Sequence, residues 1–177
     1  MTNWGAHHLD IAQWGLGMDG IGPVSVQAKA RFHKDNWYEV PEWCEITYKY
    51  ANGVTVICGQ ENKMGARFEG EKGSIYVNRG NLESTPEDLI EQPLTDKDVH
   101  LYVSKNHHQN WLECIKTRKL PICDVEIGHR TATVCHLGNI AIRTGRTIQW
   151  DPATETIVGD ADAAKRLTYT YRAPWKA

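Results

Sequence analysis

The stretch Val24-Ser25-Val26-Gln27-Ala28-Lys29-Ala30-Arg31-Phe32 decides the fold of this 177-residue chain. Apolar and polar side chains alternate along it, which is the period of two expected of a strand with one face in a core. Residues 43–51 and 54–58 have the same strand character, and Asn52-Gly53 between them is typical of a two-residue hairpin turn. The three segments predict an antiparallel meander.

Further strand signals follow the meander. Residues 67–69 and 74–78 flank Gly70-Glu71-Lys72-Gly73 and predict a second hairpin, which we expect to lengthen the same sheet. Residues 81–99 are polar and contain two prolines, so we expect a surface excursion with one helical turn. Residues 147–150 predict a final short strand.

Three segments have helical periodicity. Residues 6–16 are apolar on most sides and predict a buried helix. Residues 104–118 predict an amphipathic helix that ends before Pro121. The stripe expected to be buried on that helix consists of Trp111, Leu112 and Ile115. Residues 125–144, with Asp124 as N-cap, predict the longest helix, which should lie across the sheet.

Together these elements predict an α+β fold, an open and mostly antiparallel sheet with helices packed on one face. The length fits one core, so we expect residues 1–177 to form one compact unit. The chain has seven Trp and seven Tyr but only two Phe. Trp and Tyr rings carry one polar atom each and suit partly solvated surfaces such as ligand clefts and subunit contacts. We therefore expect a homodimer or homotetramer joined through the face of the sheet that the helices do not cover.

Composition excludes several classes of protein. The net charge of −2 provides no basic field for nucleic acid or an anionic membrane surface. No apolar run approaches the ~18 residues that a membrane span needs. The five cysteines are odd in number and unclustered, which indicates free thiols in a reducing compartment and favours the cytoplasm. A periplasmic location would require an export signal in a part of the protein preceding Met1.

Three motif-based functions are poorly supported. Gly15-Leu16-Gly17-Met18-Asp19-Gly20 matches the letters of a dinucleotide fingerprint, but a predicted helix enters it where a strand is needed. A metal site would need ligands at helical steps of three or four, and the candidate residues are instead adjacent pairs. These pairs are His7-His8, His107-His108 and Cys135-His136. A serine hydrolase is not indicated, because the sequence has no Gly-x-Ser-x-Gly.

The start of the first helix is the candidate catalytic site. Asn3 and His7 lie one helical turn apart, so the Asn3 amide oxygen can accept a hydrogen bond from one imidazole nitrogen and leave the other free for a substrate hydroxyl. The alternative is that Asn3 caps the helix and His7 is a core histidine.

This region resembles the Asp-x-Gly-x-His-x-x-Asp motif of the glucose–fructose oxidoreductase/inositol dehydrogenase (Gfo/Idh/MocA) family. The matching residues run from Asn3 to Trp14 and read Asn-Trp-Gly-Ala-His-His-Leu-Asp-Ile-Ala-Gln-Trp. The resemblance continues in order through residues 70–80, 129–141, 150–152 and 171–175.

The resemblance implies an NAD(P)-dependent oxidoreductase acting on a sugar or polyol hydroxyl. In such an enzyme an N-terminal Rossmann domain holds NAD or NADP, and an α+β domain shapes the substrate site and the oligomer. This chain resembles the second domain and lacks the family's Rossmann domain and Glu-Lys-Pro motif, so we expect it to bind no cofactor and to be inactive alone.

The resemblance also suggests roles for single residues. It implies that His7 exchanges a proton with the substrate, while Trp4 and His8 beside it are candidate substrate-binding residues. Asn3 stands where the family has an orienting Asp. Asp10 lies one turn after His7, and we expect it either to support the site without touching substrate or to pack the helix. Loss of the orienting charge leaves open an alternative from another class, a non-catalytic sugar-binding or assembly module.

Overall fold

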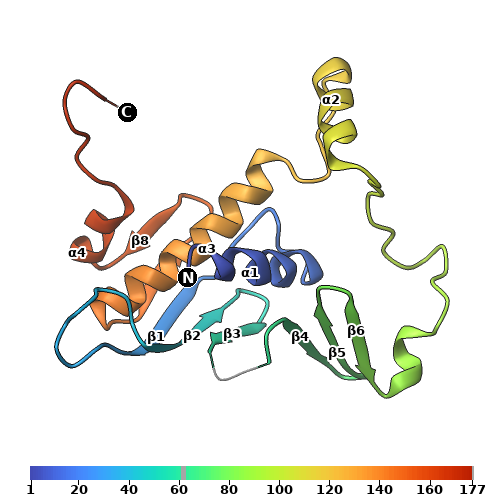
Figure 1. Ribbon diagram of the computed structural model, residues 1–177, viewed down its shortest axis with the longest axis horizontal. Helices are drawn as coiled ribbons and strands as arrows, with labels where there is room; N and C mark the ends of the chain where they lie inside the picture. Colours follow the sequence, from blue (N-terminus) through green and yellow to red (C-terminus); the bar gives the residue numbers. More distant parts are fainter. Residues whose placement is uncertain (61–62, 177) are drawn as a thin grey trace. The chain divides into compact units, whose positions relative to one another are not determined.

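The computed structural model describes residues 1–60 and 63–176 (Figure 1). The chain forms two compact units, which we call the first unit (Met1–Lys63 with Arg130–Ala177) and the second unit (Met64–His129). Length alone predicted one compact unit, and the difference has a physical reason. Every residue of the main hydrophobic core belongs to the first unit, so the second unit is organised around a smaller sheet of its own. The expected α+β class with antiparallel sheets is confirmed.

The first unit contains a five-stranded sheet in the order β3-β2-β1-β7-β8, with antiparallel neighbours throughout. Its strands are β1 (Ser25–Arg31), β2 (Trp43–Lys49), β3 (Thr55–Gly59), β7 (Ile148–Asp151) and β8 (Thr156–Val158). The predicted meander is therefore confirmed as β1, β2 and β3. The pairing places Val26 opposite both Tyr48 and Ile148, so that side chains from three strands share one buried face.

The long helix α3 (Val125–Thr144) covers that face, as predicted, and Figure 1 shows it crossing the sheet. Val134, Leu137 and Ala141 are buried in the same core cluster as the strand residues. Gly138 permits the close approach, because a Cβ at this position would overlap the Tyr48 hydroxyl oxygen. The backbone of α3 at Gly138 therefore lies directly against the Tyr48 side chain of β2, and the space between them cannot hold a methyl group.

Helix α1 (Trp4–Gly15) packs on the core of the first unit through one side, where its buried residues are Leu9 and Gln13. The prediction of a buried helix is wrong, since Trp4 and Trp14 on its other sides are about half exposed. Its many apolar residues suggested burial, but composition does not show how many sides of a helix the fold covers. Asp10 accepts a 2.8 Å hydrogen bond from the Thr131 hydroxyl of α3, which confirms its helix-packing role.

The glycine-rich loop after α1 is held by Gln13. The Gln13 side-chain amide donates to the carbonyl oxygens of Met18 (3.0 Å) and Ile21 (3.1 Å), and the Tyr50 hydroxyl donates to the Gln13 Oε1. A helix enters this loop, as the sequence predicted, and the buried amide takes up two of its carbonyl groups.

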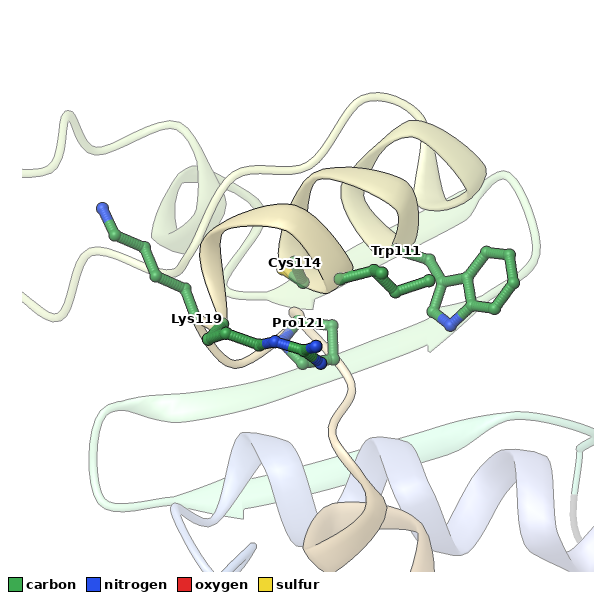
Figure 2. Close-up of a pocket in the computed structure, with 6 residues that line it drawn as sticks. Trp111, Cys114, Lys119 and Pro121 are labelled. Atoms are coloured by element: carbon green, nitrogen blue, oxygen red, sulfur yellow. The ribbon is translucent and has the colours of Figure 1, made fainter.

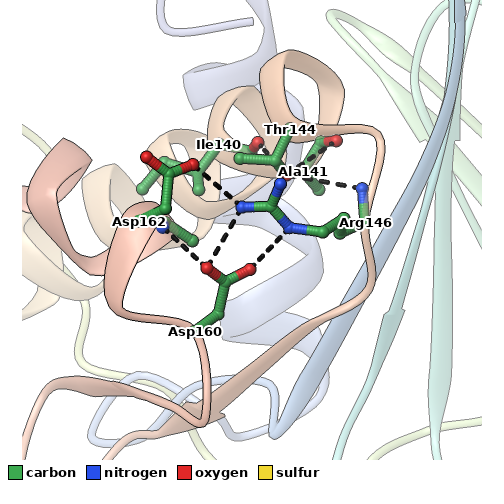
Figure 3. A network of polar contacts seen from close by, with 7 residues as sticks. Ile140, Ala141, Thr144, Arg146, Asp160 and Asp162 are labelled. Atoms are coloured by element: carbon green, nitrogen blue, oxygen red, sulfur yellow. Dashed lines mark hydrogen bonds and ion pairs between the residues drawn. The ribbon is translucent and has the colours of Figure 1, made fainter.

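A charged network closes the C-terminal part of the first unit (Figure 3). Arg146, just after α3, donates to both oxygens of Asp160 (2.7 and 3.1 Å) and to Asp162 (3.0 Å). Asp160 also caps the short helix α4 (Ala161–Ala164), because its side chain accepts from the Ala163 N–H. A 3-10 turn, η2 (Lys165–Leu167), follows. The network fixes the end of α3 to the start of α4.

The second unit begins with a separate three-stranded antiparallel sheet, β4 (Ala66–Gly70), β5 (Gly73–Asn78) and β6 (Asn81–Thr85). The second hairpin was expected to lengthen the first sheet, and this prediction is wrong. A hairpin pattern fixes the pairing of its own two strands but not the sheet that they join. Strand β6 was also missed, because most of its side chains are exposed and it has no apolar alternation to reveal it. The expected helical turn is η1 (Glu87–Ile90).

Helix α2 (His107–Thr117) completes the second unit. Its buried residue is Asn110. The Asn110 side-chain N–H donates to the Tyr102 hydroxyl before the helix, and the Asn110 Oδ1 accepts from the Ile122 N–H after the helix at 3.0 Å. The predicted buried stripe is instead exposed, with Trp111 at 60%. Periodicity locates an apolar face but not what covers it, so this part of the prediction is wrong. No helix within residues 1–60 and 63–176 is long and apolar enough to cross a membrane.

Candidate functional site

The first turn of α1 presents the predicted catalytic histidine to solvent. His7 is exposed, and its ring centroid lies 5.8 Å from that of Trp4 at an interplanar angle of 57°. The indole of Trp4 is itself 55% exposed. Residues three apart share one side of a helix, so the two rings form an open pair that we call the Trp4–His7 face. The interpretation of His7 as a core histidine is therefore wrong.

Asn3 occupies the N-cap position of α1, but its side chain makes no capping hydrogen bond. Within the described part of the chain, no hydrogen bond joins Asn3 to His7 either. The predicted orienting contact is thus not formed in this structure, and Trp4 provides the ring contact to the imidazole. His8, the neighbouring candidate, is half-buried.

The Trp4–His7 face has the components of a proton-transfer site on a hydroxyl-bearing ligand. An imidazole is the side chain whose ordinary pKa range suits it to both take and give a proton near neutral pH. An exposed indole provides a flat apolar surface with one polar N–H. Leu9 and Gln13 pack on the core from the opposite side of the helix, and the bond from Thr131 to Asp10 ties the helix to α3 one turn after His7, so these two rings stand on a fixed support.

The three cysteines of the first unit, Cys44, Cys58 and Cys135, do not supply a nucleophile. None of the three is in a disulfide. Burial raises the pKa of the Cys135 thiol to about 11 and also raises the pKa values of Cys44 and Cys58. A thiol with a raised pKa carries little thiolate at neutral pH, and these three side chains act as small apolar groups.

The paired histidines form no metal site among the described residues, and the glycine-rich loop lacks the context of a dinucleotide fingerprint. Within the part of the chain that the structure describes, no group of three His, Cys, Asp or Glu side chains is placed to hold a metal ion. The glycine-rich loop does not fit a dinucleotide, because a helix precedes it and Gln13 bonds two of its carbonyl groups from within. A phosphate site would instead need free N–H groups at the start of a helix.

A shallow hollow of about 330 Å³ lies on the second unit, beside α2 (Figure 2). It is lined by Trp111, Cys114, Ile115, Arg118, Lys119 and Pro121. Sequence reasoning assigned two of these residues to a buried stripe, so this surface was missed. The signal that could have found it is the run of basic residues directly after an apolar helix face. The lining has no carboxylate or imidazole, so it lacks the acid–base groups of the Trp4–His7 face.

Comparison with known proteins relates this geometry to one family. The family model described as the C-terminal alpha/beta domain of an oxidoreductase family matches residues 1–177. No protein of curated function matches the sequence.

Solved structures share the fold. An NAD-binding protein from Listeria innocua is 18% identical, with a TM-score of 0.57 over 83% of this chain and 46% of its own. Aldose-aldose oxidoreductase from Caulobacter crescentus, complexed with glycerol, is 21% identical, with a TM-score of 0.55 over 82% and 45%. An oxidoreductase from Agrobacterium radiobacter in complex with NAD+, L-tartaric acid and magnesium is 19% identical, with a TM-score of 0.54 over 82% and 47%.

This chain therefore spans about half the length of the solved structures that it matches. At these identities the likeness shows the shared fold, and the match of the family model over residues 1–177 shows the family. The chain belongs to the Gfo/Idh/MocA oxidoreductase family and corresponds to its C-terminal alpha/beta domain.

Proposed function

We propose that this chain is the substrate-binding and oligomerisation domain of an NAD(P)-dependent oxidoreductase that acts on a sugar or polyol hydroxyl. The observation that carries the proposal is the open Trp4–His7 face in a chain of this family. The glycerol and L-tartaric acid held by two proteins of the same fold are small hydroxyl-rich molecules, which supports this class of substrate.

Each residue of the site has a distinct role in the proposal. His7 accepts the proton of the reacting hydroxyl, and Trp4 packs its indole against the apolar C–H groups of the substrate. His8 bonds a second hydroxyl. Asn3 orients the imidazole once substrate is bound, since catalytic hydrogen bonds are often absent in a ligand-free state and form in the complex.

Oxidation of the substrate also requires a hydride acceptor, which NAD or NADP supplies when bound. The glycine-rich loop after α1 does not fit a dinucleotide, so we assign the cofactor to a Rossmann domain outside residues 1–177. A calorimetric titration of the isolated chain with NAD(H) and NADP(H) should show no binding, and micromolar affinity would overturn this assignment.

The proposed assembly is a homodimer or homotetramer joined through the face of the β3-β2-β1-β7-β8 sheet that α3 does not cover. Ile57 and Val158 on this face are more than half exposed. Lys29 and Glu45 form a 3.3 Å ion pair between neighbouring strands of the same face. A mixture of apolar and paired polar groups suits a subunit contact, and a monomeric mass in light scattering would contradict it.

The second candidate is a non-catalytic sugar-binding or assembly module. The observation in its favour is Asn3, an uncharged residue that makes no bond to His7 in the described structure. Without a carboxylate, the imidazolium that forms during oxidation is less stabilised.

The deciding experiment joins the chain to the Rossmann domain of a family member and measures NAD(P)-dependent oxidation of a panel of sugars and polyols. His7→Ala should lower kcat by about 10²- to 10⁴-fold, the typical contribution of a general base. His136→Ala, which removes an exposed imidazole from α3, is the matched control and should leave kcat unchanged.

Asn3→Asp separates the two candidate functions. Under the enzyme proposal it raises kcat, because a carboxylate stabilises the protonated His7. If neither the parent fusion nor the Asn3→Asp variant turns over any substrate while sugar binding persists, the non-catalytic module is the correct function.

A further inference from the structure

The loop that joins β1 to β2 carries a stack of aromatic rings at the surface of the first unit. It forms the blue loop beyond the ends of these strands at the left of Figure 1. The imidazole of His33 and the indole of Trp37 are stacked, with ring centroids 4.5 Å apart and planes within 22°. Tyr38 contacts the same imidazole, with a centroid distance of 5.5 Å.

Hydrogen bonds hold this loop in shape. Asn36 takes a left-handed backbone conformation (φ 52°), and its N–H donates to the His33 carbonyl at 3.0 Å, which turns the chain so that Trp37 returns over His33. The Asp35 N–H donates to His33 Nδ1 at 3.1 Å, so the imidazole is fixed and its neutral form carries the proton on Nε2. The Tyr38 hydroxyl donates to Glu42 at 3.2 Å.

The indole of Trp37 remains 76% exposed in spite of this support. His33 covers one face of the ring, so the opposite face is a flat apolar surface open to water. A tryptophan that contributes little to the core and is held rigidly at the surface is typical of a binding surface. Exposed polar side chains lie beside it in the sequence, namely Asp35, Asn36 and Glu39.

We propose that the Trp37 platform, residues 33–39, binds a pyranose ring of a saccharide. A pyranose with equatorial hydroxyls has a face of C–H groups that fits a flat indole, and its rim of hydroxyl groups donates to carboxylate and amide oxygens such as those of Asp35, Asn36 and Glu39. The site goes beyond the proposed function, since none of these residues belongs to the Trp4–His7 face. It would hold a sugar unit without reacting with it.

Two other ligand classes fit the geometry less well. A quaternary ammonium group needs several ring faces around one point, whereas the stack leaves one open face on Trp37. A protein interface usually covers about 800 Å² on each partner, much more than one short loop offers.

The test is an NMR titration of the full chain with methyl β-D-glucopyranoside, following the indole N–H signal of Trp37 assigned from Trp37→Phe. We expect this signal to shift and saturate, and Trp37→Ala to weaken binding by about tenfold, the effect of losing one aromatic stacking contact. Trp175→Ala removes another indole, 67% exposed, and is the matched control that should bind as the parent chain does.

Several results would overturn the proposal. These are the absence of a Trp37 shift at millimolar sugar, equal affinity in Trp37→Ala, and a Trp37 shift produced by choline in place of the sugar. A drop in oligomer mass in Trp37→Ala without any sugar binding would assign the loop to a protein contact. Trp4→Ala should leave the Trp37 shift unchanged, so failure of the Trp4–His7 site and failure of this platform are distinguishable.

Discussion

Helices α3 and α2 both carry the apolar periodicity of a helix that packs on a core, yet only α3 does so. The side chains of α3 that face the sheet are almost fully buried, whereas Trp111 and Ile115 of α2 are 60% and 45% exposed. The difference lies in the neighbours. Strands β1, β2 and β7 supply a wide apolar face to α3, while the buried side chain that ties α2 to Tyr102 and Ile122 of its flanking segments is the polar Asn110.

The comparison teaches that periodicity reports which side of a helix avoids water, and tertiary neighbours decide whether that side is covered. An exposed apolar helix face adds little to the stability of its unit, because its surface has not left water. The two helices should therefore respond very differently to the same kind of mutation.

The largest effect is expected for Leu137→Ala in α3. Leu137 is 1% exposed, and truncation of a buried leucine typically costs about 2–5 kcal/mol of unfolding free energy. Ile115→Ala in α2 is the counterpart and should change the unfolding free energy by less than about 0.5 kcal/mol. Urea denaturation followed by circular dichroism measures both. Equal losses in the two variants would mean that α2 is covered in solution.

An intermediate effect is expected where α3 touches β2. Gly138→Ala places a methyl group against the Tyr48 hydroxyl and should cost about 1–3 kcal/mol of unfolding free energy. Tyr48→Phe removes that oxygen, which is buried and has no hydrogen-bond partner among the described residues. The double variant should regain much of the loss, and a double-mutant cycle by urea denaturation measures the coupling. Additive losses would show that the clash lies elsewhere.

The smallest effect concerns the charged end of α3. The hydrogen bond from Arg146 lowers the pKa of the Asp160 carboxyl, and the bond from the Ala163 N–H acts in the same direction. The stability that Asp160 contributes is therefore complete above its unfolded pKa of about 3.9 and is lost as the pH falls through its lower folded value.

Asp160→Asn should lower the melting temperature by a few degrees at neutral pH and flatten its decline in acid. Arg146→Met should flatten the same decline, because it removes the first cause of the shift. Thermal melts at several pH values measure both effects, and an unchanged acid slope in both variants would refute the role of this pair.

Local patterns predicted the parts of the fold that local physics determines. The alternation in residues 24–32 and the cap and stop of α3 each depend on side chains close in sequence, and all appear in the structure. A turn does form at Asn52-Gly53, but the predicted two-residue geometry is wrong: the Tyr50 N–H donates to the Val54 carbonyl at 2.9 Å around three residues, and Gly53 but not Asn52 has a positive φ. The division into two sheets and the exposure of α2 depend on which surfaces meet at long range. No periodicity in residues 64–129 carries that information.

The candidate site also divides into features that depend on residues close in sequence and features that depend on long-range packing. The spacing of Trp4 and His7 places them on one side of α1, and the structure shows their rings in contact. Whether His7 faces solvent or the core depends on how α1 packs. The apolar composition of α1 predicted a buried helix, whereas His7 is exposed. The hydrogen bond expected from Asn3 depends on side-chain rotamers, which sequence spacing permits but does not fix.

Gln13 shows how one buried side chain can determine the conformation of a loop that follows it. It donates two hydrogen bonds to carbonyl groups of that loop and accepts one from the Tyr50 hydroxyl. A glutamate of the same shape would turn a second oxygen toward those carbonyl groups, and a leucine would leave three polar groups facing an alkyl chain. The conformation of the loop after α1 therefore depends on the side-chain amide of Gln13, which precedes the loop, so a redesign of this loop has to include position 13.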